Sequence, residues 1–153
     1  MYSKDEAKRI RQAFWTALGQ YMGLHASAEG QKVNWINYKT GLKHLYFRME
    51  AGSREATISI EIAHPDEGIR ALMFEQFLSF RSLLHGMLGE EWNWIQEHTD
   101  EYGKTTARIS QTISGVSVFN QADWPQLISF FKPRMLTLDE FWTDAQYSFD
   151  LFK

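Results

Sequence analysis

Apolar and polar residues alternate along two neighbouring stretches, residues 42–50 and 55–63. The apolar positions are Leu45, Phe47 and Met49 in the first stretch and Ile58, Ile60 and Ile62 in the second. Successive side chains of a strand point to opposite faces, so this alternation predicts two strands that share one apolar and one polar face.

Three further stretches have the composition of strands. Residues 33–38 precede a Lys-Thr-Gly turn, residues 92–98 follow a glycine-rich exit from a helix, and residues 105–114 alternate again. The connections at 51–54 and 99–104 are too short for a crossover. Neighbouring strands are therefore expected to pair as hairpins.

Spacings of three and four residues between apolar side chains predict helices elsewhere. The first is expected over residues 4–24 and the second over residues 65–87, with Pro65, Asp66 and Glu67 in its first turn. A third is expected from Asp123 to Lys132, because Pro133 disfavours helical geometry in the residue before it. A fourth is expected from Thr137 onwards.

The predicted element order is α-β-β-β-α-β-β-α-α. This order indicates the α+β class, with a mixed or mainly antiparallel sheet of four to five strands whose apolar face is covered by helices. A chain of 153 residues has the usual length of one domain and buries about 70% of its unfolded surface. We therefore expect a single domain over residues 1–153.

The amino-acid composition is that of a folded globular protein and excludes several kinds of site. Apolar residues make up 44% of the chain and charged residues 23%, as in folded globular proteins. The absence of cysteine excludes disulfides, thiolate zinc sites and a thiol nucleophile. The charged start of the chain and the lack of a long apolar run predict neither a secretory signal nor a membrane span, so a cytoplasmic location is expected.

Charge is unevenly distributed along the chain. The net charge is 16 − 19 = −3, which does not favour a domain that coats nucleic acid over its whole surface. Residues 1–54 carry nine basic and four acidic side chains, or +5, whereas residues 55–153 carry seven and fifteen, or −8. Such asymmetry indicates either an anionic ligand at one end or a dipolar surface through which two copies pair head to tail.

The polar sheet face is the main candidate for a binding site. Alternation places polar side chains of three strands there, with two lysines beside them; the candidate ligand-binding residues are Lys39, Lys43, Tyr46, Arg48, Glu61 and Arg108. Arginines beside an aromatic ring can hold a phosphate or carboxylate and stack on a base. The alternative is that the arginines pair with Glu50 or Glu61 across strands, as on an ordinary sheet surface.

Enzyme motifs are mostly absent, since the chain has no P-loop, GxGxxG, HExxH or GxSxG. The element order is similar to that of the PD-(D/E)xK nucleases, in which two strand acids hold magnesium. Glu50 and Glu61 occupy about those places, but Ala63 stands where that pattern has lysine, and His64 is the substitute at hand. The five histidines show no spacing typical of a transition-metal site.

Four segments carry a family resemblance: VNWINYKTGLKHLYFRMEA, ATISIEIAHPDEG, FEQF and GEEWNW. Together they resemble a bacterial domain-of-unknown-function family numbered 4268, over nearly the whole chain. In that family the domain often follows a region resembling restriction endonucleases. The resemblance therefore implies an association with nucleic acids or defence systems, and it supplies no catalytic residues.

Two functions remain open from the sequence. The first is a non-catalytic binding or assembly module without a cofactor, whose partner is a second copy, a nucleic acid or a nuclease, and which has no membrane partner. The second is a divergent or degenerate metal-dependent nuclease in which Glu50 and Glu61 bind magnesium.

Overall fold

The computed structural model describes residues 2–153 and contains a four-stranded sheet. The strands are β1 (Leu45–Ala51), β2 (Glu55–Ile62), β3 (Asn93–Thr99) and β4 (Thr105–Ser114), in the spatial order β1-β2-β4-β3. Every neighbouring pair is antiparallel. The predicted α+β class with a mainly antiparallel sheet is confirmed.

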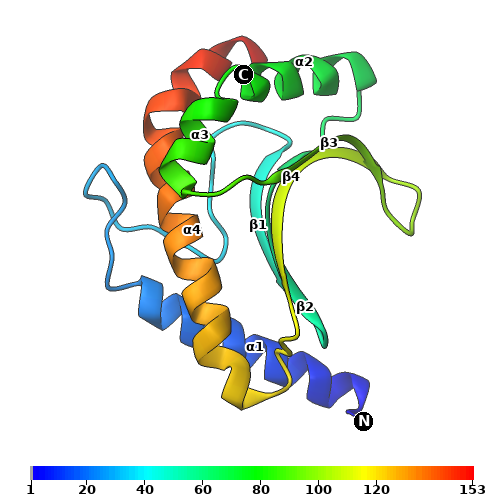
Figure 1. Ribbon diagram of the computed structural model, residues 1–153, viewed down its shortest axis with the longest axis vertical. Coiled ribbons are helices and arrows are strands. Elements are labelled where there is room, and N and C mark those ends of the chain that lie inside the picture. The colour runs from blue at the N-terminus through cyan, green and yellow to red at the C-terminus, as the bar shows by residue number, and fades with distance from the viewer. Residues whose placement is uncertain (1) are drawn as a thin grey trace.

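Helices cover one face of this sheet (Figure 1). They are α1 (Lys4–Met22), α2 (Glu67–Leu78), α3 (Arg81–Leu88) and α4 (Trp124–Ala145), with short 3-10 turns η1 (Gln121–Asp123) and η2 (Gln146–Phe152) at the two ends of α4. α4 runs along the whole sheet, α1 crosses below it, and α2 lies at the opposite end. The fold therefore has two layers, and the second face of the sheet is left uncovered.

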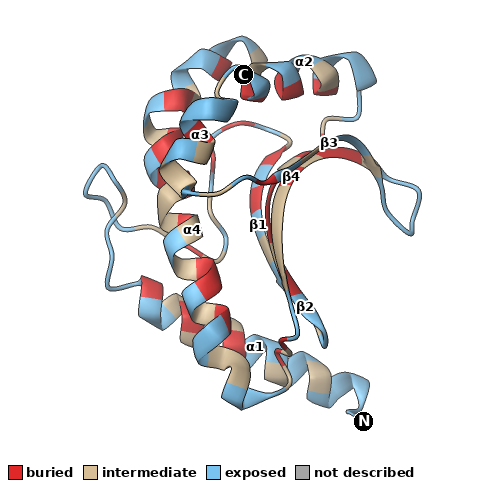
Figure 2. Cartoon of the chain, in the orientation of Figure 1, coloured by how far each residue is buried: buried red, intermediate tan, exposed pale blue. Residues whose placement is uncertain are grey.

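The core lies where the helices meet the sheet (Figure 2). Ile58, Ile60 and Ile62 of β2 are fully buried, as the alternation predicts. Phe47 of β1 meets Trp142 of α4 edge to face, with ring centroids 5.9 Å apart. Large rings thus fill the space between the two layers, which accounts for much of the high aromatic content of the chain.

The uncovered face is concave. The sheet bends strongly, and the β3–β4 hairpin curls away from the helices over the uncovered side (Figure 1). The pairing of β3 with β4 shifts register between Ile95 and His98, and such an irregularity bends a strand locally. The bend turns the polar face of the sheet into a hollow.

One predicted strand is wrong. Residues 33–38 form turns and irregular backbone beside β1 instead of a ladder. The side chain of Asn34 accepts the N–H of Asn37 at 3.2 Å, which closes a turn in the middle of the segment. The aromatic residues of the segment are still buried or half-buried, since Tyr38 stacks on Phe47 with centroids 5.2 Å apart. Burial without a ladder explains the strand-like composition.

Two predicted helix boundaries also differ. The expected helix over 65–87 begins at Glu67, after Asp66 as its N-cap, and is divided into α2 and α3 at Ser79–Phe80. The expected break at Pro133 does not occur, and α4 continues through this proline. Phe131 and Met135 on either side of it are fully buried. Each such burial contributes about 1.5–3 kcal/mol, enough to offset a helix-interior proline that costs about 3 kcal/mol.

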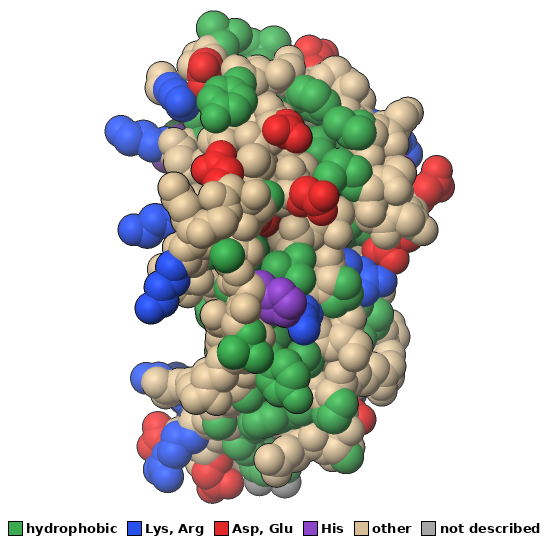
Figure 3. All heavy atoms as spheres, turned by 90° about the vertical axis from the view of Figure 1, so that its left-hand side faces the viewer, with side chains coloured by type: hydrophobic (Ala, Val, Ile, Leu, Met, Phe, Trp, Pro, Cys, Tyr) green, Lys and Arg blue, Asp and Glu red, His purple; other side chains and the backbone are tan. Residues whose placement is uncertain are grey.

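Basic and acidic side chains are unevenly distributed on the face shown in Figure 3. On the face shown in Figure 3, Lys and Arg side chains gather along the left edge, and most of the acidic side chains in view lie in the upper half. Among the helices that the structure describes, none combines the length and apolar character needed to cross a membrane.

Candidate functional site

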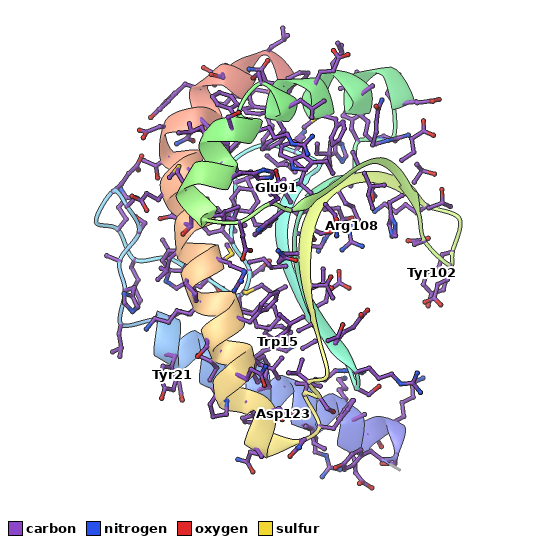
Figure 4. The ribbon with its side chains drawn as sticks, viewed as in Figure 1. Trp15, Tyr21, Glu91, Tyr102, Arg108 and Asp123 are labelled. Atoms are coloured by element: carbon purple, nitrogen blue, oxygen red, sulfur yellow. The ribbon has the colours of Figure 1, made fainter. Side chains whose placement is uncertain are left out.

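A groove occupies the concave face of the sheet. It has a volume of about 740 Å³ and is lined by polar side chains of β1, β2 and β4 and by the curled hairpin from His98 to Tyr102. We call it the polar groove. Figure 4 shows Arg108 on this side of the sheet and Tyr102 at the tip of the hairpin. The predicted residues Tyr46, Arg48, Glu61 and Arg108 all line it.

Arg48 is engaged by its neighbours on the sheet. Its Nε donates to Glu61 in an ion pair between β1 and β2, and Glu61 is largely buried. The Arg48 guanidinium lies 4.2 Å from the centre of the Tyr46 ring, within cation–π range. Tyr46 lies directly opposite Glu61 in the register, so the three side chains form one compact group.

Arg108 is engaged in the same way. One Nη donates to the Ser59 hydroxyl at 3.3 Å and lies 3.5 Å from Glu50. The other Nη lies 3.4 Å from His98 Nε2. Its Nε is buried without a hydrogen-bond partner within the described residues. Both predicted arginines therefore contact the sheet's own side chains, as in the cross-strand alternative.

The ion pairs leave the polar groove negatively charged. The charged side chains that line it are Arg48 and Arg108 against Glu50, Glu61, Asp100 and Glu101, or 2 − 4 = −2. Asp100 is occupied by the hairpin turn, where one carboxylate oxygen accepts the N–H groups of Tyr102 and Lys104. Aromatic surface remains available, because Tyr102 is 87% exposed and Tyr46 is 38% exposed.

The two predicted lysines lie elsewhere. Lys39 is exposed and lines a separate pocket between the 27–40 segment and α4. Lys43 is exposed in the turn before β1 and is not among the residues that line the polar groove. The basic character expected for the polar face from these lysines is therefore missing from the groove itself.

Glu50 and Glu61 face the same side but are not adjacent. Glu50 pairs with Thr57 and Glu61 with Tyr46, so the two acids are four positions apart in register, or about 13 Å along the strands. Arg48 lies between them on the same face of β1, and each acid contacts a different arginine. Oxygen ligands of magnesium lie about 2.1 Å from the ion, so this arrangement does not present the pair to one ion. Within residues 2–153 no group of three potential metal ligands occurs.

The sequence did not predict the role of Asp139, a buried aspartate of α4. Asp139 of α4 is 4% exposed; it accepts the Tyr38 hydroxyl at 2.6 Å and the Ala28 N–H at 2.8 Å. Burial, and then the hydrogen bond to Asp139, raises the pKa of Tyr38 far above its usual range. Asp139 thereby holds the long segment between α1 and β1 against α4. A helix pattern alone gives no signal for this role, because an acid in a helix is usually exposed.

A second polar cluster fixes the start of β3 to α4. Arg134 binds Glu90 through two hydrogen bonds of 2.9 and 2.7 Å, and Trp92 and Gln111 also donate to Glu90. Burial alone would raise the pKa of Glu90, but these donors outweigh it and hold the pKa below its ordinary value. The cluster lies away from the polar groove and has a structural role.

Comparison with known proteins shows which family the chain belongs to, but it does not show a function. Neither curated proteins nor solved structures gave a match to this chain. A family model described as a domain of unknown function (DUF4268) matches residues 10–146, which is nearly the whole chain. The chain therefore belongs to the DUF4268 family.

Proposed function

We propose that the protein is a non-catalytic binding module whose polar groove holds a segment of a partner polypeptide. The observation that carries this proposal is the pairing of both groove arginines with acids of the same sheet, which leaves a net charge of −2. The groove adds two tyrosine rings that present apolar surface with a polar end. Such a surface suits a cationic or neutral peptide.

A polypeptide is favoured over a nucleic acid on charge. Phosphate backbones are bound by arginines and lysines that are free to neutralise them. Here Arg48 contacts Glu61, Arg108 contacts Glu50, and two further acids line the hairpin side. A phosphate would have to displace an acid from an arginine. The association with nucleases or defence systems that the sequence resemblance implies would then act through contact with a protein.

A binding role is favoured over the nuclease alternative by the placement of the two candidate metal ligands. Glu50 and Glu61 are separated by Arg48 along the same face, and an arginine at that position repels a divalent cation. No specific contact in the described residues favours metal-assisted hydrolysis.

Three fluorescent probes test the proposal: a short Lys/Arg-rich peptide, an Asp/Glu-rich peptide of equal length, and a single-stranded oligonucleotide. Fluorescence anisotropy at low ionic strength is expected to give the tightest binding for the basic peptide. Tyr46→Ala and Glu50→Gln should each weaken that binding about three- to tenfold. Glu140→Gln makes the same charge change at an exposed site on α4 and should have no effect. Tightest binding of the oligonucleotide, or equal binding by all variants, would refute the proposal.

A further inference from the structure

A second groove lies between α1 and the edge strand β1. It has a volume of about 680 Å³, and its apolar floor is formed by Trp15, Ile36 and Met49. Lys8 and Arg11 stand at its rim, and no carboxylate from residues 2–153 lines it. We call it the α1 groove. An apolar floor with a purely basic rim fits an apolar side chain that is flanked by acids.

The tip of the β3–β4 hairpin has this complementary chemistry. Tyr102 is 87% exposed, and Asp100 and Glu101 precede it directly. Residues 97–104 carry three acids and one lysine, a net charge of −2 against the +2 of the α1 groove. Tyrosine is among the residue types that most often anchor interfaces, because its large ring buries apolar surface while its hydroxyl can still find a polar partner.

The tip is also held rigidly in its exposed position. Asp100 Oδ1 accepts the N–H groups of both Tyr102 and Lys104 at 2.9 Å. The Asp100 N–H donates to the Lys104 carbonyl at 2.9 Å, and Gly103 provides the left-handed conformation with φ of +81°. A preorganised ring loses little conformational entropy when it binds, which favours its use as an anchor.

We propose that the hairpin tip of one copy docks into the α1 groove of a second copy. The two surfaces are continuous, because Ile36 and Met49 line both the α1 groove and the polar groove, and the tip forms a wall of the latter. In the proposed arrangement a two-fold axis passes through this continuous surface, so that both tips dock reciprocally. The result is a closed dimer with two identical contacts.

The expected affinity is modest. A buried tyrosine removes about 150–250 Å² of surface from water, so two rings and their flanking residues bury less than the roughly 1,200 Å² of standard interfaces. The dimer is therefore expected to dissociate on dilution and to weaken with added salt. The dimer and the proposed peptide binding share the hairpin tip, because Asp100, Glu101 and Tyr102 also line the polar groove. Lys8 and Arg11 line the α1 groove and not the polar groove, so variants at Lys8 test the dimer separately from peptide binding.

Sedimentation velocity over a range of protein and salt concentrations tests the dimer. Lys8→Glu is expected to raise its dissociation constant about tenfold, whereas Arg9→Glu, an exposed site on α1 outside the groove, should leave it unchanged. Adding Glu101→Lys to Lys8→Glu should restore most of the affinity. Thermal unfolding of each variant shows that it is folded.

Two tyrosine variants test whether dimerisation depends on the hairpin tip or on any exposed aromatic ring. Tyr102→Ala should abolish dimerisation, and Tyr147→Ala, which removes an exposed ring on η2, should not. A native protein that stays monomeric at every concentration would overturn the proposal. Equal effects of Lys8→Glu and Arg9→Glu, or tip-dependent chains longer than dimers, would overturn the reciprocal arrangement.

Discussion

The anchoring of residues 23–44 by Asp139 gives the sharpest prediction about stability. Tyr38→Phe removes one hydroxyl and keeps the ring, which stacks on Phe47 and on Trp35 with centroids 5.2 and 6.1 Å apart. Only the 2.6 Å hydrogen bond to Asp139 is lost. The substitution therefore isolates one contact between the irregular segment and α4.

The magnitude follows from the burial of the acceptor. Hydrogen bonds to charged groups contribute about 1.5–3 kcal/mol, and a buried acceptor left without its donor costs an amount in that range. Asp139 is 4% exposed, so water cannot readily replace the lost hydroxyl. We expect Tyr38→Phe to lower the free energy of unfolding by about 2 kcal/mol.

Urea denaturation followed by circular dichroism measures this change. Tyr147→Phe removes a hydroxyl from a 65% exposed ring and should change stability by less than about 0.5 kcal/mol. A double-mutant cycle of Tyr38→Phe with Asp139→Asn should give a coupling energy above about 1 kcal/mol, because the two groups are in contact. Additive effects, or a Tyr38→Phe effect equal to that of Tyr147→Phe, would refute the anchoring role.

Two further predictions concern α4. The donors around Glu90 lower its pKa below the ordinary 4.5, so the ionised acid stabilises the fold fully above that pH and progressively less as the pH falls through the lowered value. Glu90→Gln should thus have a lower free energy of unfolding than the native protein near neutral pH, and this difference should shrink below about pH 4.5. Urea titrations at several pH values measure the difference, and a difference that does not depend on pH would contradict this prediction. Pro133→Ala should raise the free energy of unfolding by about 1–3 kcal/mol, because it restores a helix-interior donor at an exposed position, and an unchanged or lower denaturation midpoint would contradict this.

The fold was predictable from the sequence where a strand has one face buried beneath the helices, because burial of one face produces an alternating pattern of apolar residues. Alternation located β1, β2 and β4 to within a few residues, because one face of each strand is buried beneath helices. Residues 33–38 were predicted as a strand from composition and do not form one, since Trp35 and Tyr38 pack inwards from irregular backbone. A helix end was predicted at Pro133, but α4 continues through this residue, because burial of its neighbours outweighs the local preference of proline to end a helix.

The candidate site was predictable as a set of residues and not as a set of contacts. Alternation placed Tyr46, Arg48, Glu61 and Arg108 on one face, and the register brings them together. Which acid each arginine contacts depends on side-chain conformation as well as on register: Arg108 lies opposite Glu61 in the register but contacts Glu50. Asp139 was missed because its partners, Tyr38 and Ala28, lie more than a hundred residues away in the chain.

The effect of Arg48→Gln on basic-peptide binding is the most direct test of the polar groove. If Arg48 neutralises Glu61, the substitution changes the net charge of the groove from −2 to −3, and the basic peptide should bind several-fold more tightly. If the basic peptide does not bind in the polar groove, the substitution should leave its binding unchanged. We expect tighter binding of the basic peptide by Arg48→Gln in anisotropy measurements at low ionic strength, and we expect added salt to abolish it. Unchanged or weaker binding would contradict the proposed function.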